Sequence, residues 1–186
     1  MEILDAIVTR RSIKTYEDRP VPDESIRRLL EVAVMAPNHR MTEPWRFYVL
    51  GPEARSAYGA ALGARKAKRV EDPAAAEAVV QKVADSHRSL PAMLAVSMTL
   101  DENPEIREED YAACCMAVQN VCLAAHAMGL GTHIKTGAVM DDPSARAAVG
   151  VDDGERVIVT VSLGEPAEMP DAKPRRQASE LTKWVP

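Results

Sequence analysis

Residues 9–16 read TRRSIKTY and directly follow residues 2–10, whose apolar positions have the spacing of a short helix. If that helix ends near Arg10 and the chain continues extended, Arg10, Ser12 and Lys14 point to the same side. Two cations and a hydroxyl group suit a terminal phosphate, which carries nearly two negative charges. The same residues allow a simpler interpretation, in which the arginines only stabilise the negatively polarised end of the helix.

The composition limits which functions this cluster can serve. The chain has 186 residues, a formal net charge of -5 and a pI near 5.4, which argues against a general nucleic-acid-binding protein. Apolar residues make up 46% but aromatic residues only 4%, so many helices or a partner subunit are needed to close the core. The length suits one domain. No apolar run reaches membrane-spanning length and acids stand near the N-terminus, so we expect a cytoplasmic protein without a membrane partner.

The three cysteines, Cys114, Cys115 and Cys122, are an odd number and show no Cys-x-x-Cys spacing. We therefore expect neither a disulfide framework nor a metal site. Cys115 and Cys122 are seven residues apart, on one helical face, as expected for small buried apolar side chains.

Hydrophobic spacing, together with proline and glycine positions, predicts the elements of the whole chain. Residues 107–128 are apolar on nearly all sides and predict a central buried helix. Residues 164–186 show no regular spacing of apolar residues, which predicts an extended tail. Because the tail ends in Leu181 and Trp184, we expect its last residues to cover an apolar surface. The predicted helices cover residues 2–10, 22–36, 53–69, 74–88, 107–128 and 143–150, and the predicted strands cover residues 45–50, 92–100, 132–136 and 156–163.

Three further stretches carry groups that bind ligands in other proteins. In KPRR, residues 173–176, the first lysine and first arginine lie on one side if the tail is extended, although solvated tail charge explains them as well. APNHRMTEPW, residues 36–45, is a constrained loop whose histidine, taken alone, is an ordinary loop residue. GLGTHIKTG, residues 129–137, lacks the third glycine of a dinucleotide fingerprint, but its backbone can lie against a flat ligand.

Together and in this order, these features resemble the FMN-dependent nitroreductase superfamily, in its compact branch. The resemblance implies an α+β fold, in which helices flank a central, mostly antiparallel sheet. It also implies one FMN-binding domain over residues 1–186 and an intertwined homodimer that exchanges its C-terminal arms, residues 164–186. The motifs that carry the resemblance are RRSIKTY at 10–16, APNHRMTEPWRF at 36–47, MGLG at 128–131, and GEP at 164–166 followed by KPRR at 173–176.

The resemblance also implies a binding site for FMN at the dimer interface. One group of residues holds the phosphate and ribityl chain: Arg10, Arg11, Ser12, Lys14, Lys173 and Arg175. A second group meets the flavin ring system: Asn38 and His39 at its edge or at the ribityl hydroxyls, and backbone donors of Lys135, Thr136 and Gly137 at N5 and O4. Met41 and Glu43 depart from many relatives, which have Asn and Gln at these positions, so polar contacts made there by relatives are in doubt.

The implied activity is an NAD(P)H-dependent oxidoreductase that transfers hydride in ping-pong order to small electron-poor acceptors such as nitroaromatics or quinones. The flavin carries this chemistry, so no side chain is assigned as catalytic. Three alternatives stay open at this point. They are a non-catalytic FMN-binding or storage protein, a specialised flavin enzyme such as a reductive dehalogenase or an oxygen-using enzyme, and a helical dimer without a cofactor.

Overall fold

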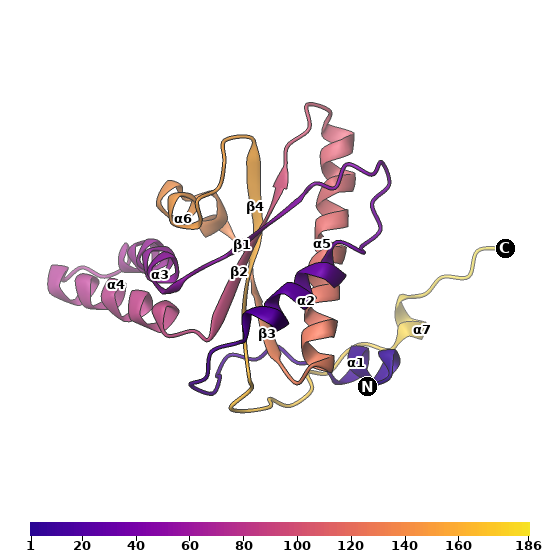
Figure 1. Ribbon diagram of the computed structural model, residues 1–186, viewed down its shortest axis with the longest axis horizontal. Helices are drawn as coiled ribbons and strands as arrows, with labels where there is room; N and C mark the ends of the chain where they lie inside the picture. Colours follow the sequence, from indigo (N-terminus) through magenta and orange to yellow (C-terminus); the bar gives the residue numbers. More distant parts are fainter.

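The computed structural model describes residues 1–186, and its centre is a four-stranded sheet with helices on both faces (Figure 1). The strand order is β1-β2-β4-β3, and every neighbouring pair is antiparallel. This confirms the expected α+β architecture with an antiparallel sheet. Each predicted strand end lies within one residue of the observed one: β1 is Trp45–Val49, β2 Ala92–Thr99, β3 Gly131–Lys135 and β4 Glu155–Gly164.

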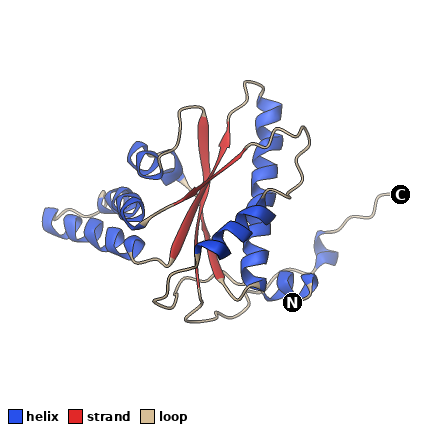
Figure 2. Cartoon of the chain, viewed as in Figure 1, coloured by secondary structure: helices blue, strands red, loops and turns tan.

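The helices form two layers on opposite sides of the sheet (Figure 2). One layer contains α2 (Asp23–Ala33) and α5 (Pro104–Ala127), and the other contains α3 (Pro52–Ala67), α4 (Pro73–Arg88) and α6 (Pro143–Val149). Strand β2 supplies both interfaces because successive side chains point to opposite faces. Its Leu94 and Val96 join the core under α2 and α5, whereas Met93 and Ala95 join the core under α3 and α6.

Local sequence explains most helix ends. An aspartate precedes a proline at the start of both α4 and α6, and each aspartate accepts a hydrogen bond from a backbone N–H of the first turn: Asp72 from Ala75, and Asp142 from Ser144 and Ala145. The expected end of α2 near residue 36 was wrong by three residues, since the helix ends at Ala33 and continues as turns. The short 3-10 helix η1 (Ala138–Asp141) was not predicted.

Helix α5 differs from its sequence-based description in three respects, the first being that it begins at Pro104, three residues before the predicted start. Tyr111 and Met116 are 41% and 40% exposed, so within one chain the helix is not covered on all sides. Cys114 and Cys122 are the fully buried cysteines, and Cys115 is only half-buried, so the expectation that Cys115 and Cys122 share the core was half wrong. Burial raises the pKa of the Cys114 thiol to about 12, which is the behaviour of an inert core cysteine.

The two ends of the chain lie on the same side of the molecule and project from its body, as Figure 1 shows. They form the short helices α1 (Ile3–Thr9) and α7 (Ala178–Leu181). Helix α7 was not predicted and begins with a capping box between Gln177 and Glu180. Both ends leave apolar side chains at least half exposed: Ile3, Leu4, Ile7 and Val8 in α1, and Leu181, Trp184 and Val185 in the tail. None of the helices combines the length and apolar character needed to cross a membrane.

Candidate functional site

A cavity of about 730 Å³ lies between the N-terminal segment and the C-terminal tail. The segment after α1 contributes Arg10, Arg11, Ser12 and Lys14, and the tail contributes Lys173 and Arg175. All six residues that the resemblance assigned to the phosphate and ribityl chain therefore line one cavity of a single chain. Its volume falls within the range of cofactor pockets, about 300–1,000 Å³.

The charges around this cavity are mostly unpaired. Arg10, Lys14, Lys173 and Arg175 form no side-chain hydrogen bond or ion pair within the chain. Arg11 differs, because its guanidinium donates to the carbonyl oxygens of Val8 and Arg10, at 2.9 Å each. The helix-end interpretation thus fits Arg11 alone, while the other four cations keep their hydrogen-bonding capacity for a ligand.

Two carboxylates, Glu168 and Asp171, line the same cavity, and neither lies within ion-pair distance of its cations. The cavity has five cationic side chains against these two acids. It is therefore positive in a chain whose formal net charge is -5. A positive cavity on an acidic protein favours a small anion over an extended polyanion.

The extended segment that carries Ser12 and Lys14 is fixed to the edge of the sheet. Ser12 pairs with Thr132 of β3 in parallel orientation, and Ile13 N–H donates to Thr132 O at 2.9 Å. Ile13 is buried whereas its two neighbours are exposed, so the predicted alternation holds. A Cβ on Gly131 would collide with the Ile13 side chain, so the first residue of β3 has to be glycine for this contact.

Tyr16 anchors the far end of this segment, which the sequence did not indicate. Its hydroxyl donates to Ile13 O at 2.8 Å and lies 3.1 Å from both oxygens of Ser162 in β4. Burial raises the pKa of Tyr16 to about 12, so the hydroxyl stays protonated and can donate.

Two histidines outside this cavity, His126 and His133, have pKa values that burial and nearby positive charges lower. His126 of α5 lies 2.8 Å from Thr9 Oγ1, and burial, then Arg10 and Arg11, lower its pKa. Burial, then Lys135 and Lys14, lower the pKa of His133 on β3. Both imidazoles are therefore disfavoured as cations, as expected beside several fixed positive charges.

The residues assigned to the flavin ring lie at the other end of β3. Lys135 is its last residue, three positions after Thr132, or about 10 Å along the strand. Gly137 has φ = +115°, a conformation that other residues rarely adopt, and it begins the η1 turn. Residues 135–137 therefore form the end of β3, the strand that pairs with Ser12, and the turn that follows it. The positive φ of Gly137 in this turn favours glycine.

Lys135 also has a partner that sequence reasoning missed. Its Nζ lies 3.2 Å from Nε2 of His87, a histidine of α4 that is only 5% exposed. The signal was present in the sequence, because Val83, Ala84 and His87 recur with the spacing of one helical face. The sequence predicted this helix over residues 74–88 but assigned no role to its histidine.

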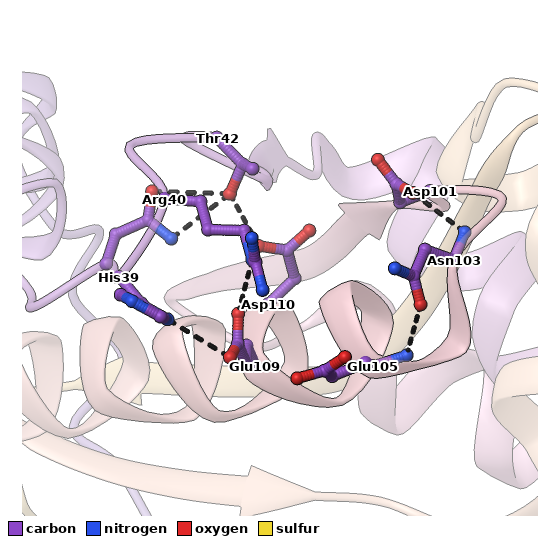
Figure 3. Close-up of polar contacts among 9 residues, drawn as sticks. His39, Arg40, Thr42, Asp101, Asn103, Glu105, Glu109 and Asp110 are labelled. Atoms are coloured by element: carbon purple, nitrogen blue, oxygen red, sulfur yellow. Dashed lines mark hydrogen bonds and ion pairs between the residues drawn. The ribbon is translucent and has the colours of Figure 1, made fainter.

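His39 lies in a loop that is bound to the N-terminal half of α5, as Figure 3 shows, and Asn38 precedes it in the same loop. The Asn38 carboxamide accepts from Glu43 N–H at 2.8 Å and donates to Thr42 Oγ1 at 3.1 Å. The Thr42 hydroxyl in turn donates to Asp110, a carboxylate that is 2% exposed. Asn38 therefore stabilises the loop conformation from within.

His39 and Arg40 both contact Glu109 on the surface of α5 (Figure 3). The distances are 3.0 Å from His39 Nδ1 and 2.9 Å from Arg40 Nε to the two carboxylate oxygens. These hydrogen bonds lower the pKa of Glu109. The cluster is exposed, so it contributes little to stability but orients the loop.

This loop and the cationic cavity lie at opposite ends of α5. The loop contacts Glu109 and Asp110, whereas α1 reaches the same helix at His126. Positions 110 and 126 are sixteen residues apart along the helix, which corresponds to about 24 Å along the axis. Within one chain, Asn38 and His39 are therefore not brought to the cavity that Arg10 and Lys173 line.

The donors present fit an FMN phosphate. Four unpaired cations and the Ser12 hydroxyl surround one cavity, and a phosphate accepts charge-assisted hydrogen bonds from such groups. A second, smaller cavity of about 190 Å³ shares Arg10 and Arg11 with the first and is lined by Gly131 and Thr132 at the start of the edge strand β3. The chemistry of this donor set is thus that of a phosphate-binding site.

Comparison with known proteins gives consistent matches over most of the chain. The sequence profile of the Nitroreductase family matches residues 7–165. YfhC of Bacillus subtilis, provisionally named an NAD(P)H nitroreductase, is 36% identical over 171 residues, covering 92% of this chain and 88% of that protein.

Two solved structures are also similar. One is a nitroreductase-like family protein of Bacillus cereus, with a TM-score of 0.86 and 28% identity, covering 100% of this chain and 96% of that one. The other is a protein of Desulfovibrio desulfuricans, provisionally described as a nitroreductase and solved in complex with FMN. Its TM-score is 0.75 at 26% identity, covering 100% of this chain and 98% of that one.

Proposed function

This chain belongs to the nitroreductase family, and on that premise we propose that it is an NAD(P)H-dependent FMN oxidoreductase acting on small electron-poor acceptors, such as nitroaromatics or quinones. The observation that carries the proposal is the cavity in which unpaired cations from both ends of the chain meet. The names of the relatives support the cofactors, because one is called an NAD(P)H nitroreductase and another was solved with FMN.

We assign the phosphate and ribityl chain of FMN to this cavity. Arg10, Lys14, Lys173 and Arg175 supply cationic donors, and Ser12 supplies a hydroxyl. Arg11 contributes mainly charge, since its donors are already engaged at the end of α1.

The flavin ring is assigned to the end of β3. When bound, FMN would supply the redox chemistry, in which the hydride given up by NAD(P)H, as it becomes NAD(P)⁺, reaches the acceptor as two electrons and a proton. The backbone of Thr136 and Gly137 donates hydrogen bonds toward N5 and O4 in this assignment. Lys135 adds a positive charge near the ring, which stabilises the negative charge that the flavin gains on reduction. No side chain is assigned as a nucleophile or acid.

We further propose that the functional unit is a homodimer with two FMN sites at its interface. The exposed apolar side chains of α1, of the α5 face and of the tail from Leu181 to Val185 favour a partner subunit. Residues 1–186 would then form one FMN-binding domain, with residues 164–186 as an arm that crosses to the partner. We expect this dimer to be cytoplasmic.

A dimer also accounts for the loop that carries Asn38 and His39. Because this loop lies about 24 Å along α5 from the cavity of its own chain, its contact with a flavin requires the site of the other protomer. Glu43 of the same loop would add a negative charge near that flavin and disfavour acidic acceptors.

The test is the visible spectrum of the purified protein, recorded without air before and after addition of NADPH or NADH. A yellow protein that bleaches with either nucleotide supports the proposal. A yellow protein that is indifferent to both is an FMN-binding or storage protein, and a colourless protein that rejects added FMN has no flavin function. A reductive dehalogenase would bleach but release halide from a halogenated acceptor.

A further inference from the structure

The pair formed by His87 and Lys135 has a defined proton arrangement. His87 Nδ1 lies 2.8 Å from Val83 O, and a carbonyl oxygen can only accept, so Nδ1 carries the proton. In a neutral ring Nε2 then has a free lone pair, and Lys135 Nζ lies 3.2 Å from it. Lys135 therefore donates to a neutral His87.

The groups around the pair keep the histidine neutral. Tyr58 of α3 packs against the imidazole with a centroid distance of 5.8 Å, and Ser86 Oγ lies 3.4 Å from Nδ1. Burial, Lys135 and Lys66 lower the pKa of His87, and burial followed by Lys66 lowers that of Lys135. No carboxylate forms an ion pair with Lys135, so His87 is its only polar side-chain partner in the chain.

The contact between Lys135 and His87 joins the end of β3 to helix α4. Strand β3 is an edge strand, paired in the sheet with β4 alone, and Lys135 is its last residue. The backbone then turns through Thr136 and Gly137, the residues assigned to the flavin ring. His87 thus connects this turn, through Lys135, to helix α4 of the layer formed by α3, α4 and α6.

Resting on the proposed function, we propose that His87 is a positioning residue for the flavin ring. It holds the ammonium of Lys135, and with it the turn at Thr136 and Gly137, in the arrangement that hydride transfer requires. His87 acts through Lys135 and does not touch the phosphate cavity. Its loss should therefore slow flavin reduction while leaving FMN affinity nearly unchanged.

The experiment compares four variants. His87→Leu removes the acceptor, His87→Gln retains an acceptor oxygen at a similar distance from the backbone, and Lys135→Met removes the donor. Lys82→Met is the matched control, because Lys82 is an exposed lysine of the same helix as His87. For each protein we would measure the Kd of FMN by flavin fluorescence and the rate constant of bleaching by the preferred nucleotide without air.

We expect His87→Leu to bind FMN within threefold of wild type but to bleach at least tenfold more slowly. Lys135→Met, which removes a group assigned to the flavin ring, should also bleach at least tenfold more slowly. His87→Gln should stay within threefold of wild type in both measurements, and Lys82→Met should match wild type. Wild-type rates in His87→Leu and Lys135→Met would overturn the inference. So would a folded His87→Gln protein as slow as the leucine variant. If His87→Leu does not fold, the glutamine and lysine variants decide.

A second measurement uses the FMN-free protein and no activity. Because protonated His87 can no longer accept from Lys135, the Tm of the wild type should fall more between pH 7 and pH 5 than that of His87→Gln. Equal pH dependence in the two proteins would show that the hydrogen bond is absent.

The failures of the two proposals are distinguishable. A wild-type protein that binds no FMN, or does not bleach, overturns the proposed function and this inference together. A wild-type protein that bleaches, with His87→Leu equally fast, overturns only the inference.

Discussion

Replacing both Arg10 and Lys14 by alanine tests the phosphate assignment most directly. Neither side chain has a partner within the chain, so their removal breaks no internal hydrogen bond. Each charge-assisted hydrogen bond to a ligand contributes about 1.5–3 kcal/mol. Lys14 is exposed and Arg10 half-buried, so we take the lower value for each. The double variant should then lose about 3 kcal/mol, or roughly a hundredfold in the Kd of FMN.

The assay compares FMN with riboflavin, which has the same ring system and no phosphate. Titration with each ligand, followed by flavin fluorescence, gives two Kd values for every protein. Only the Kd of FMN should rise in the Arg10→Ala/Lys14→Ala protein, and the salt dependence of FMN binding should become weaker. Size-exclusion chromatography checks that the oligomeric state is unchanged.

Two control variants sharpen the result. Arg27→Ala/Lys82→Ala removes the same charge from two exposed positions outside the cavity and should leave both Kd values unchanged. Arg11→Ala should have a smaller effect than Arg10→Ala, because the Arg11 guanidinium already donates to two carbonyl oxygens. Full FMN affinity in the double variant, or an equal loss for riboflavin, would refute the phosphate assignment.

Three further predictions concern stability. Met41 has φ = 51° and is 75% exposed, so Met41→Asn should stabilise the protein by about 0.5–1 kcal/mol in urea unfolding, whereas the equally exposed Met35→Asn should not. A Cβ on Gly59 would lie 2.7 Å from Val83 O, so Gly59→Ala should cost about 1–2 kcal/mol despite the better helix propensity of alanine; Gly51→Ala, which meets open space, is its control. The folded pKa values of His87, His126 and His133 are lowered, so the unfolded chain binds protons more readily and Tm should begin to fall as the pH drops below about 6.5; a flat Tm from pH 7 to 5 would contradict this.

The sequence alone predicted the local elements well where local chemistry decides them. The Asp-Pro pairs at 72–73 and 142–143 fix two helix starts through capping and the preset φ of proline. The run at 92–99 is apolar apart from Ser97 and Thr99, and its length and composition favour a strand that is covered on both faces. The alternation around Ile13 was also readable, because one strand period determines which side chains face outward.

The sequence indicated the kind of ligand that the candidate site binds, but it did not indicate which of the candidate residues are free to contact that ligand. A phosphate needs several cations, so the cluster at 10–14 was enough to suggest a phosphate, whereas FMN and the role of Lys173 and Arg175 came from the resemblance to the nitroreductase superfamily. Sequence could not show that Arg11 is engaged at a helix end, or that the loop of His39 lies far from the cavity. Both facts depend on contacts made by residues that are distant in sequence.

What the sequence by itself determined is the set of elements and the kind of anion that its basic residues suit, since periodicity, capping and charge act over a few residues. Only the tertiary structure decided that residues 10–14 and 173–175 line one cavity and that a buried His87 meets Lys135. The physical reason is that both arrangements follow from the pairing of an edge strand and the packing of helices upon the sheet. These interactions join positions about 50 to 160 residues apart, for which no local pattern carries a signal.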